Sequence, residues 1–311
     1  MDLPGNNADA GPFARPKCLR SRSGLGLIEG LMNFRTPIGS RVRWAALVTL
    51  LELVIAPGEL PAQTATTPEL SSYAVLGIAG VTVRAESRVT FGAVGSIEGT
   101  LRIGREARVS NVAAAPTVRV GAASHTGTVF CHLVSGPPPL PSCTAFIDPL
   151  VDPTLLTPVT VVPGASDLRL PAHTGTEPIP AGSFRNVRVG AGSVLQLAGG
   201  AYVARSLRVG RGAQVVCATD CRIGVLGSVR VGRAATLGAA SPARANSVRL
   251  DIASSDGLPA FVARRRARVS ATIFAPAGDV LLAAHGAHRG AFVGRTVVVG
   301  PGTTVRGDSA L

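Results

Sequence analysis

"SLRVGRGAQVVC" (residues 206–217) decides the fold, because close copies of it recur along the chain. The copies read VRVGAGSVLQL (187–197), VRVGRAATL (229–237) and LRIGREARV (101–109). A glycine follows each aliphatic–Arg–aliphatic step, and these glycines are Gly104, Gly121, Gly190, Gly210, Gly232 and Gly300, with compact intervals of 17, 20 and 22 residues. A repeat near 20 residues is typical of a solenoid, in which each coil stacks on the next.

Each repeat has a simple physical interpretation. Two aliphatic residues alternate with one arginine, so the aliphatic side chains point to one side of a strand and the arginine to the other. The glycine permits a corner in the backbone that a Cβ atom would oppose. The chain is 46% hydrophobic but only 4% aromatic, which suits stacked strands of β-branched residues. We therefore predict an all-β fold, a single-stranded parallel β-helix with coils of about 17–22 residues.

The repeat indicates the handedness of the β-helix less directly than it indicates the fold class. Left-handed β-helices are built from hexapeptides, and the stretches VGAGSVL and VGRAATL show that spacing. The spacing is not sustained, however, and the coil length varies. We predict a right-handed β-helix, with a left-handed hexapeptide β-helix as the alternative.

The start of the chain resembles an export signal. Arg41 and Arg43 precede a twelve-residue apolar segment (45–56) that is too short to span a bilayer. We expect residues 32–65 to be a signal peptide that starts at Met32, residues 1–31 to be a mis-assigned extension, and the mature protein to be exported without a transmembrane anchor. The remaining predicted parts are N-terminal coils (66–121), an insertion with eleven prolines (122–186) and the main solenoid (187–311).

Four cysteines follow the signal peptide, and an even number is compatible with disulfides in an exported protein. The pairing of sequence neighbours joins Cys131 to Cys143 and Cys217 to Cys221. Free thiols and a metal site are the alternatives. The C-x3-C spacing lacks a nearby histidine or a second cysteine pair, so we predict no metal and no cofactor.

The C-terminal 130 residues resemble a group of bacterial exported β-helix proteins of uncharacterised function. The resemblance rests on LAGGAYVARSLRVGRGAQV (197–215) and ATIFAPAGDVLLAAHGAHRGAFVGRTVVVGPGTTV (271–305). It extends loosely to bactofilins, which are polymer-forming β-helix proteins. Bactofilins are generally cytoplasmic, and the signal peptide predicted here departs from that pattern.

The net charge is +13, and nearly all the basic residues are arginine. Five arginines occupy the same position of the repeat, so coils that stack would align them in a column broken in two by the insertion: Arg102, Arg119, Arg188, Arg208 and Arg230. Val262, Leu281 and Val298 take this position in the last coils. One interpretation is a polyanion-binding stripe for envelope polysaccharide or lipid phosphate. The other is a row of solvated outward side chains.

These observations predict a non-catalytic structural, adhesive or polyanion-binding element of the bacterial cell envelope, which could self-associate through the ends of its solenoid. The basic cluster at 263–268 has no interleaved aromatic residues, so nucleic acid is not an expected partner. Two alternatives remain. One is a polysaccharide lyase or hydrolase on the same scaffold, and the other is a left-handed acyltransferase with His285 or His288 as its base.

Overall fold

The computed structural model describes residues 70–146, 148, 150–240, 243–254 and 259–308. The predicted extension and signal peptide lie outside this part of the chain. The described chain is built of short β-strands and three short 3-10 segments, η1 (Leu70–Ser72), η2 (Pro153–Leu156) and η3 (Ala245–Ser247). The strands stack as a parallel β-solenoid, which confirms the predicted fold class.

One side of the solenoid, called face 1 below, is a ten-stranded sheet in which each strand pairs in parallel with the next. The aliphatic residues of these strands point inward and the polar residues point outward, as expected for strands with a period of two. In spatial order the strands are β13 (Thr176–Ile179), β15 (Val194–Leu197), β17 (Gln214–Cys217), β20 (Thr236–Ala239), β23 (Arg268–Ser270), β26 (Ala287–Arg289), β28 (Thr304–Arg306), β2 (Arg88–Thr90), β5 (Arg108–Val109) and β8 (His125–Thr126).

The other two sides belong to one 18-stranded sheet that bends along its length. Face 2 holds β18 (Cys221–Val225), β21 (Val248–Ile252), β24 (Thr272–Ala275), β3 (Ala93–Ser96), β6 (Ala113–Ala114), β9 (Val129–Phe130) and β11 (Cys143–Thr144). Face 3 holds β12 (Leu168–Leu170), β19 (Val229–Val231), β22 (Pro259–Ala263), β25 (Asp279–Leu282), β4 (Thr100–Ile103), β7 (Thr117–Val120) and β10 (Leu133–Ser135). Four longer strands run through both faces: β1 (Tyr73–Val83), β14 (Gly182–Val189), β16 (Gly200–Val209) and β27 (Phe292–Val299).

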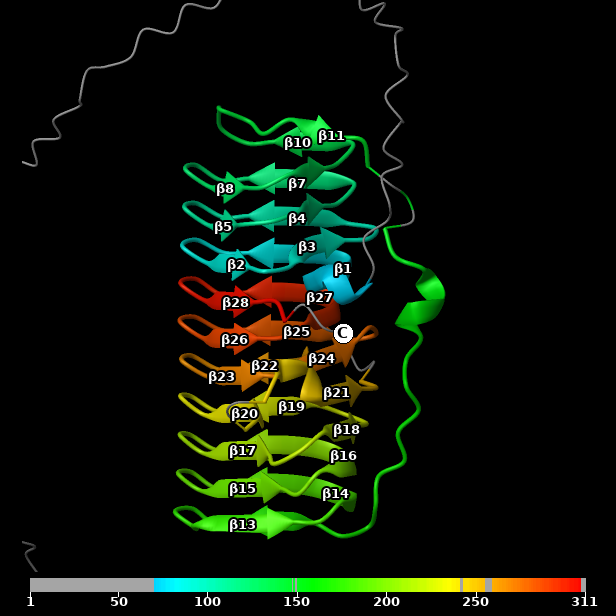
Figure 1. Ribbon diagram of the computed structural model, residues 1–311, viewed down its shortest axis with the longest axis vertical. Coiled ribbons are helices and arrows are strands. Elements are labelled where there is room, and N and C mark those ends of the chain that lie inside the picture. The colour runs from blue at the N-terminus through cyan, green and yellow to red at the C-terminus, as the bar shows by residue number, and fades with distance from the viewer. Residues whose placement is uncertain (1–69, 147, 149, 241–242, 255–258, 309–311) are drawn as a thin grey trace, which may run out of the picture. The chain divides into compact units, whose positions relative to one another are not determined.

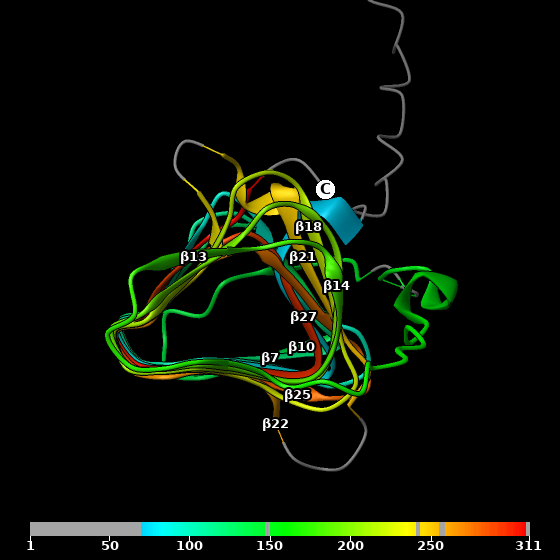
Figure 2. The same cartoon turned by 90° about the horizontal axis from the view of Figure 1, so that it is seen from below.

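The solenoid is triangular in cross-section and right-handed (Figure 2). Seen from below, the chain runs from face 3 through the left corner to face 1, then to face 2, and so turns clockwise as the coils climb away from the viewer. This agrees with the predicted hand and not with the left-handed alternative.

The coils are not stacked in the order of the sequence (Figure 1). The chain from β12 to β28 builds one end of the solenoid, and the first described coil then lies on top of the last one. Val83 of β1 pairs with Val299 of β27, and Val89 of β2 pairs with Val305 of β28. The N-terminal coils therefore continue the stack of the C-terminal coils.

A return segment (145–167) connects the two ends of the stack. It leaves β11 at one end, passes along face 2 and enters β12 at the other end (Figure 1). Leu150 and Val151 pack with Tyr73, Phe274 and Val293 in an apolar cluster outside the solenoid interior. The segment outside the stack is thus shorter than the insertion predicted at 122–186, because strands β8 to β11 and β12 to β14 add coils at its two ends.

The interior is a single aliphatic cluster that runs through all the coils. The two disulfides predicted from the sequence are confirmed, and they join Cys131 to Cys143 and Cys217 to Cys221. The first of them fixes β11 beside the coil beneath, where Cys143 pairs with Val129.

The corner glycines act differently from our expectation. The left-handed backbone lies two residues after the glycine of the V-R-V-G step, as at Gly212 (φ 64°) and at Ala234 (φ 54°). Gly210 and Gly232 are needed for another reason: a Cβ atom on Gly232 would lie 2.6 Å from the backbone of Gly210 in the coil below. These glycines allow neighbouring coils to approach closely at the corner.

Candidate functional site

The five arginines predicted to align do occupy one column on face 3. Arg188 pairs with Arg208, Arg208 pairs with Arg230, and Arg102 pairs with Arg119. Arg169, which was not among the predicted members, pairs with Arg188 and begins the column. The sequence pattern that indicates Arg169 is the short LRL step at 168–170, which lies inside the range predicted to be an insertion.

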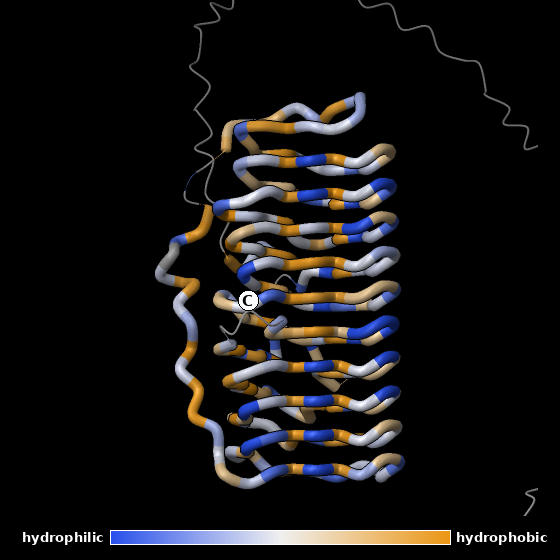
Figure 3. Tube along the Cα trace, turned by 180° about the vertical axis from the view of Figure 1, so that it is seen from behind, coloured by the Kyte–Doolittle hydropathy of each residue, from blue (hydrophilic) through white to orange (hydrophobic). Residues whose placement is uncertain are grey.

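The column is interrupted, but not by the insertion as predicted. Val262, Leu281, Val298 and Thr82 hold the same outward position between Arg230 and Arg102. The interruption is therefore a change of residue type without a change of register. The hydropathy colouring in Figure 3 shows hydrophilic positions stacked along this face in both end regions and hydrophobic ones between them.

Most guanidinium groups of the column lack a carboxylate partner. Arg102, Arg119, Arg188 and Arg208 are exposed, and none of them forms an ion pair with a carboxylate of the described residues. The strands lie about 4.8 Å apart, and like charges directly opposite one another on neighbouring strands are destabilising. The column thus favours the binding of an anion that bridges successive arginines.

Two members of the column have a special environment. Arg169 pairs with Asp167 at 3.0 Å, and hydrogen bonds from Arg185 and Asn186 hold the pKa of this carboxyl well below its usual range. Arg230 has its Nε buried, with no hydrogen-bond partner in the described part of the chain. Asp167 therefore partly neutralises one end of the column.

A hollow of about 610 Å³ lies at the corner of the solenoid, beside the two arginines of the column that belong to the N-terminal coils. Arg84 and Arg105 from the corner line it together with Arg102 and Arg119 from face 3. Arg105 lies 3.3 Å from Glu106, but both side chains are more than half exposed, so this ion pair adds little stability. Four guanidinium groups therefore surround one hollow, and no carboxylate lines it.

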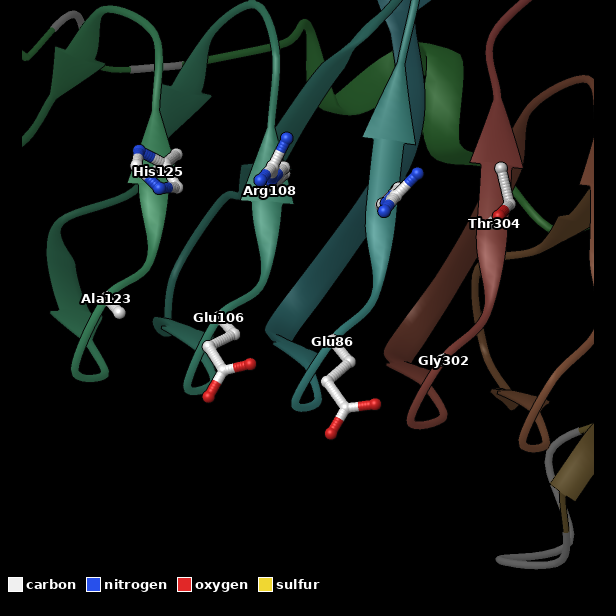
Figure 4. A pocket seen from close by; sticks show the side chains of 8 residues that line it. Glu86, Glu106, Arg108, Ala123, His125, Gly302 and Thr304 are labelled. Carbon is white, nitrogen blue, oxygen red and sulfur yellow. The ribbon is translucent and has the colours of Figure 1, made fainter. Parts of the chain in front are cut away.

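A second hollow, of about 490 Å³, lies across the corner on face 1 (Figure 4). Arg88, Arg108 and His125 form its row of basic side chains, and Glu86 and Glu106 lie beside them at the corner. This group of side chains was not predicted from the sequence. Its signal was the repeated Glu-x-Arg-Val step at 86–89 and 106–109.

The two histidines considered for acyl transfer do not form a site. His285 is exposed at a corner, whereas His288 is 3% exposed in the core, where burial lowers its pKa to about 4. Its ring packs edge-on against the ring of Phe292, and the two ring centroids lie 5.8 Å apart. Within the described ranges, no group of three His, Cys, Asp or Glu side chains is placed to hold a metal ion.

The described residues also contain no helix that is long and apolar enough to cross a membrane. No family model matches the chain, and no curated protein matches it.

Two solved structures are distantly similar. One is an ice-binding protein from the Antarctic ascomycete Antarctomyces psychrotrophicus, with 12% identity and a TM-score of 0.33 over 78% of this chain and 97% of that one. The other is an ice-binding protein from an Antarctic biological consortium, with the same identity and TM-score over 78% of this chain and 90% of that one. These comparisons do not support the resemblance to bactofilins or a bacterial origin.

Proposed function

We propose that the protein is an exported, non-catalytic binding protein that holds a polyanion of the cell envelope along face 3. The observation that carries this proposal is the column of arginines in register, most of them without a carboxylate partner. An arginine presents a planar fork of donors that matches a carboxylate or a phosphate group. A polymer that bears such groups at regular intervals could contact one arginine on each coil.

The two disulfides support export, because disulfides persist in oxidising compartments outside the cytoplasm. The shared chemistry of the ligand is a row of anionic oxygens, which either an acidic polysaccharide or a phosphate-bearing lipid surface can supply. Exposed charges on the protein are screened by salt, so binding of either ligand weakens as ionic strength rises.

The test uses the purified full chain, an oligogalacturonate and, separately, vesicles that contain phosphatidylglycerol, each at low and at physiological salt. The triple variant R188Q/R208Q/R230Q removes three charges from the column. The matched control R211Q/R233Q/R265Q removes three exposed charges from the corners of nearby coils.

We expect the column variant to lose at least tenfold in affinity for one of the two ligands, and the control to lose less than threefold. The ligand that responds identifies the source of the anionic groups. Equal losses in the two variants would mean that only net charge matters, and no binding of either ligand would overturn the proposal.

A further inference from the structure

We propose that the hollow on face 1 is a second binding site, and that its ligand is an acidic polysaccharide that lies along the solenoid axis. This site is on the ten-stranded sheet, across the corner from the column of face 3. The inference therefore stands on other residues than the proposed function, and variants of one face leave the other intact.

The hollow is formed by two parallel rows of side chains. The first row is basic: Arg88 pairs with Arg108, and Arg108 pairs with His125 on the next coil. Thr304 pairs with Arg88 and continues the row on the other side. The second row lies at the corner, where Glu86 and Glu106 occupy equivalent positions two residues before the two arginines. Figure 4 shows the second row at the corner loops, with the carboxylates of Glu86 and Glu106 directed away from Arg108 and His125 of the first row.

The rows differ in the groups that they recognise. The guanidinium groups of Arg88 and Arg108 can each bind a carboxylate or sulfate with two parallel hydrogen bonds. The carboxylates of Glu86 and Glu106 accept hydrogen bonds from hydroxyl groups and repel anions. A matching ligand carries anionic groups along one edge and hydroxyl groups along the other.

An acidic polysaccharide carries both kinds of group on its sugar residues, whereas a polyphosphate has charge along its whole backbone and no hydroxyl groups for the second row. The spacing also fits, since successive strands lie about 4.8 Å apart, which is comparable to the length of one pyranose ring in an extended chain. The hollow of about 490 Å³ is within the usual range of ligand clefts, about 300–1,000 Å³.

The experiment must separate this site from face 3. We therefore use the chain with R102Q, R119Q, R188Q, R208Q and R230Q together. Five of the six arginines of the column on face 3 are then neutralised, the sixth, Arg169, is paired with Asp167, and the hollow of face 1 is unchanged. The probes are an oligogalacturonate, its methyl ester and a polyphosphate of the same charge, and the measurement is isothermal titration calorimetry. Circular dichroism verifies that each variant keeps its β-structure.

We expect residual binding of oligogalacturonate at least tenfold tighter than that of the methyl ester, and its loss in R88Q/R108Q. The change E86Q/E106Q has a diagnostic effect, because it weakens the binding of oligogalacturonate severalfold and strengthens that of polyphosphate. The double variant R88Q/R108Q keeps the row of carboxylates, and the double variant E86Q/E106Q keeps the row of basic side chains.

Three results would overturn the proposal. Binding that R88Q/R108Q leaves unchanged would place the ligand elsewhere. Tighter binding of both anions by E86Q/E106Q would reduce the hollow to an electrostatic patch without recognition of hydroxyl groups. New reducing ends during the titration, lost in E86Q/E106Q, would show that the two carboxylates cleave the polysaccharide instead of binding it.

Discussion

The hydroxyl of Ser87 donates a hydrogen bond of 2.7 Å to the backbone carbonyl of Gly300, and both groups are buried. Ser87 belongs to the first described coil and Gly300 to the last, so this bond lies at the junction between the two halves of the stack. The same corner contact recurs one coil below, where Thr303 donates to Ala283 at 2.9 Å. The junction thus repeats the geometry of an ordinary step between coils.

Replacing Ser87 by alanine is expected to destabilise the fold by about 1–2 kcal/mol, because a buried carbonyl loses its hydroxyl donor. Urea unfolding followed by circular dichroism measures the change in the free energy of unfolding. Ser124→Ala is the matched control, since Ser124 donates within its own coil, to Gly121, and its loss leaves the junction intact. Equal effects of the two substitutions would mean that the hydrogen bond between coils stabilises the fold no more than the bond within one coil.

Two glycines of one corner are expected to respond differently to alanine. Gly232→Ala should cost about 3 kcal/mol, since the added Cβ lies 2.6 Å from backbone atoms of Gly210 and the packing leaves it no room. Gly212→Ala should cost about 1 kcal/mol, because nothing lies within 4 Å of its Cβ position and only the left-handed backbone opposes alanine. Ala234 already adopts this conformation. Thermal unfolding of both variants tests the order, and a larger loss for Gly212→Ala would refute it.

His288 should make the stability depend on pH. Its pKa in the folded chain is about 4 because burial disfavours the charged ring, whereas an unfolded histidine has a pKa of about 6.5. Between these values the unfolded chain binds a proton that the folded chain does not. The free energy of unfolding therefore falls as pH decreases from about 6.5 to about 4, by about 3 kcal/mol in total, and this contribution is constant above pH 6.5.

The variant His288→Val tests this dependence. Val269 and Val305 are the partners of His288 in the adjacent strands, so valine suits the position. Both ring nitrogens of His288 are buried and lack hydrogen bonds within the described residues, so the variant should be at least as stable as the native chain at pH 7.5. The measurement is the difference in unfolding free energy between variant and native chain from pH 7.5 to 4. An unchanged difference across this range would argue against a buried neutral histidine.

The column on face 3 could be predicted because, in a strand, the side chain of an arginine between two aliphatic residues points to the opposite side from theirs. Once the aliphatic residues enter the core, Arg188 and Arg208 must point outward and align in successive coils. The group on face 1 was harder to detect, since Arg88 and Arg108 lie in very short strands and their motif occurs only twice.

The order of the coils could not be predicted from the repeat. Every coil presents the same kind of parallel edge, so the pairing of Val83 with Val299 is no more encoded in the local pattern than a pairing between sequence neighbours. The choice depends on the return segment, whose Leu150 and Val151 pack on face 2. Those contacts come from a proline-rich stretch without periodicity, which local patterns do not place.

Prolines block one open end of the solenoid. Gly190 and Ala198 donate their backbone N–H groups to the coil below, to Leu170 and Ile179. The positions below them in the terminal coil are Pro171 and Pro180, which follow Leu170 and Ile179 and have no N–H to offer to a further strand. Prolines at an open edge are a known protection against edge-to-edge pairing, so this end opposes the self-association predicted from the sequence.

The double variant P171G/P180A should remove this protection, because it restores two N–H donors at the open edge. We expect the native chain to sediment as a monomer and the variant to form dimers or larger species as its concentration rises, measured by analytical ultracentrifugation. P158A is the matched control, since Pro158 lies in the return segment away from the edge. Association of the native chain to the same extent as the double variant would show that its copies meet through another surface, and a monomeric double variant would show that other groups also block this end.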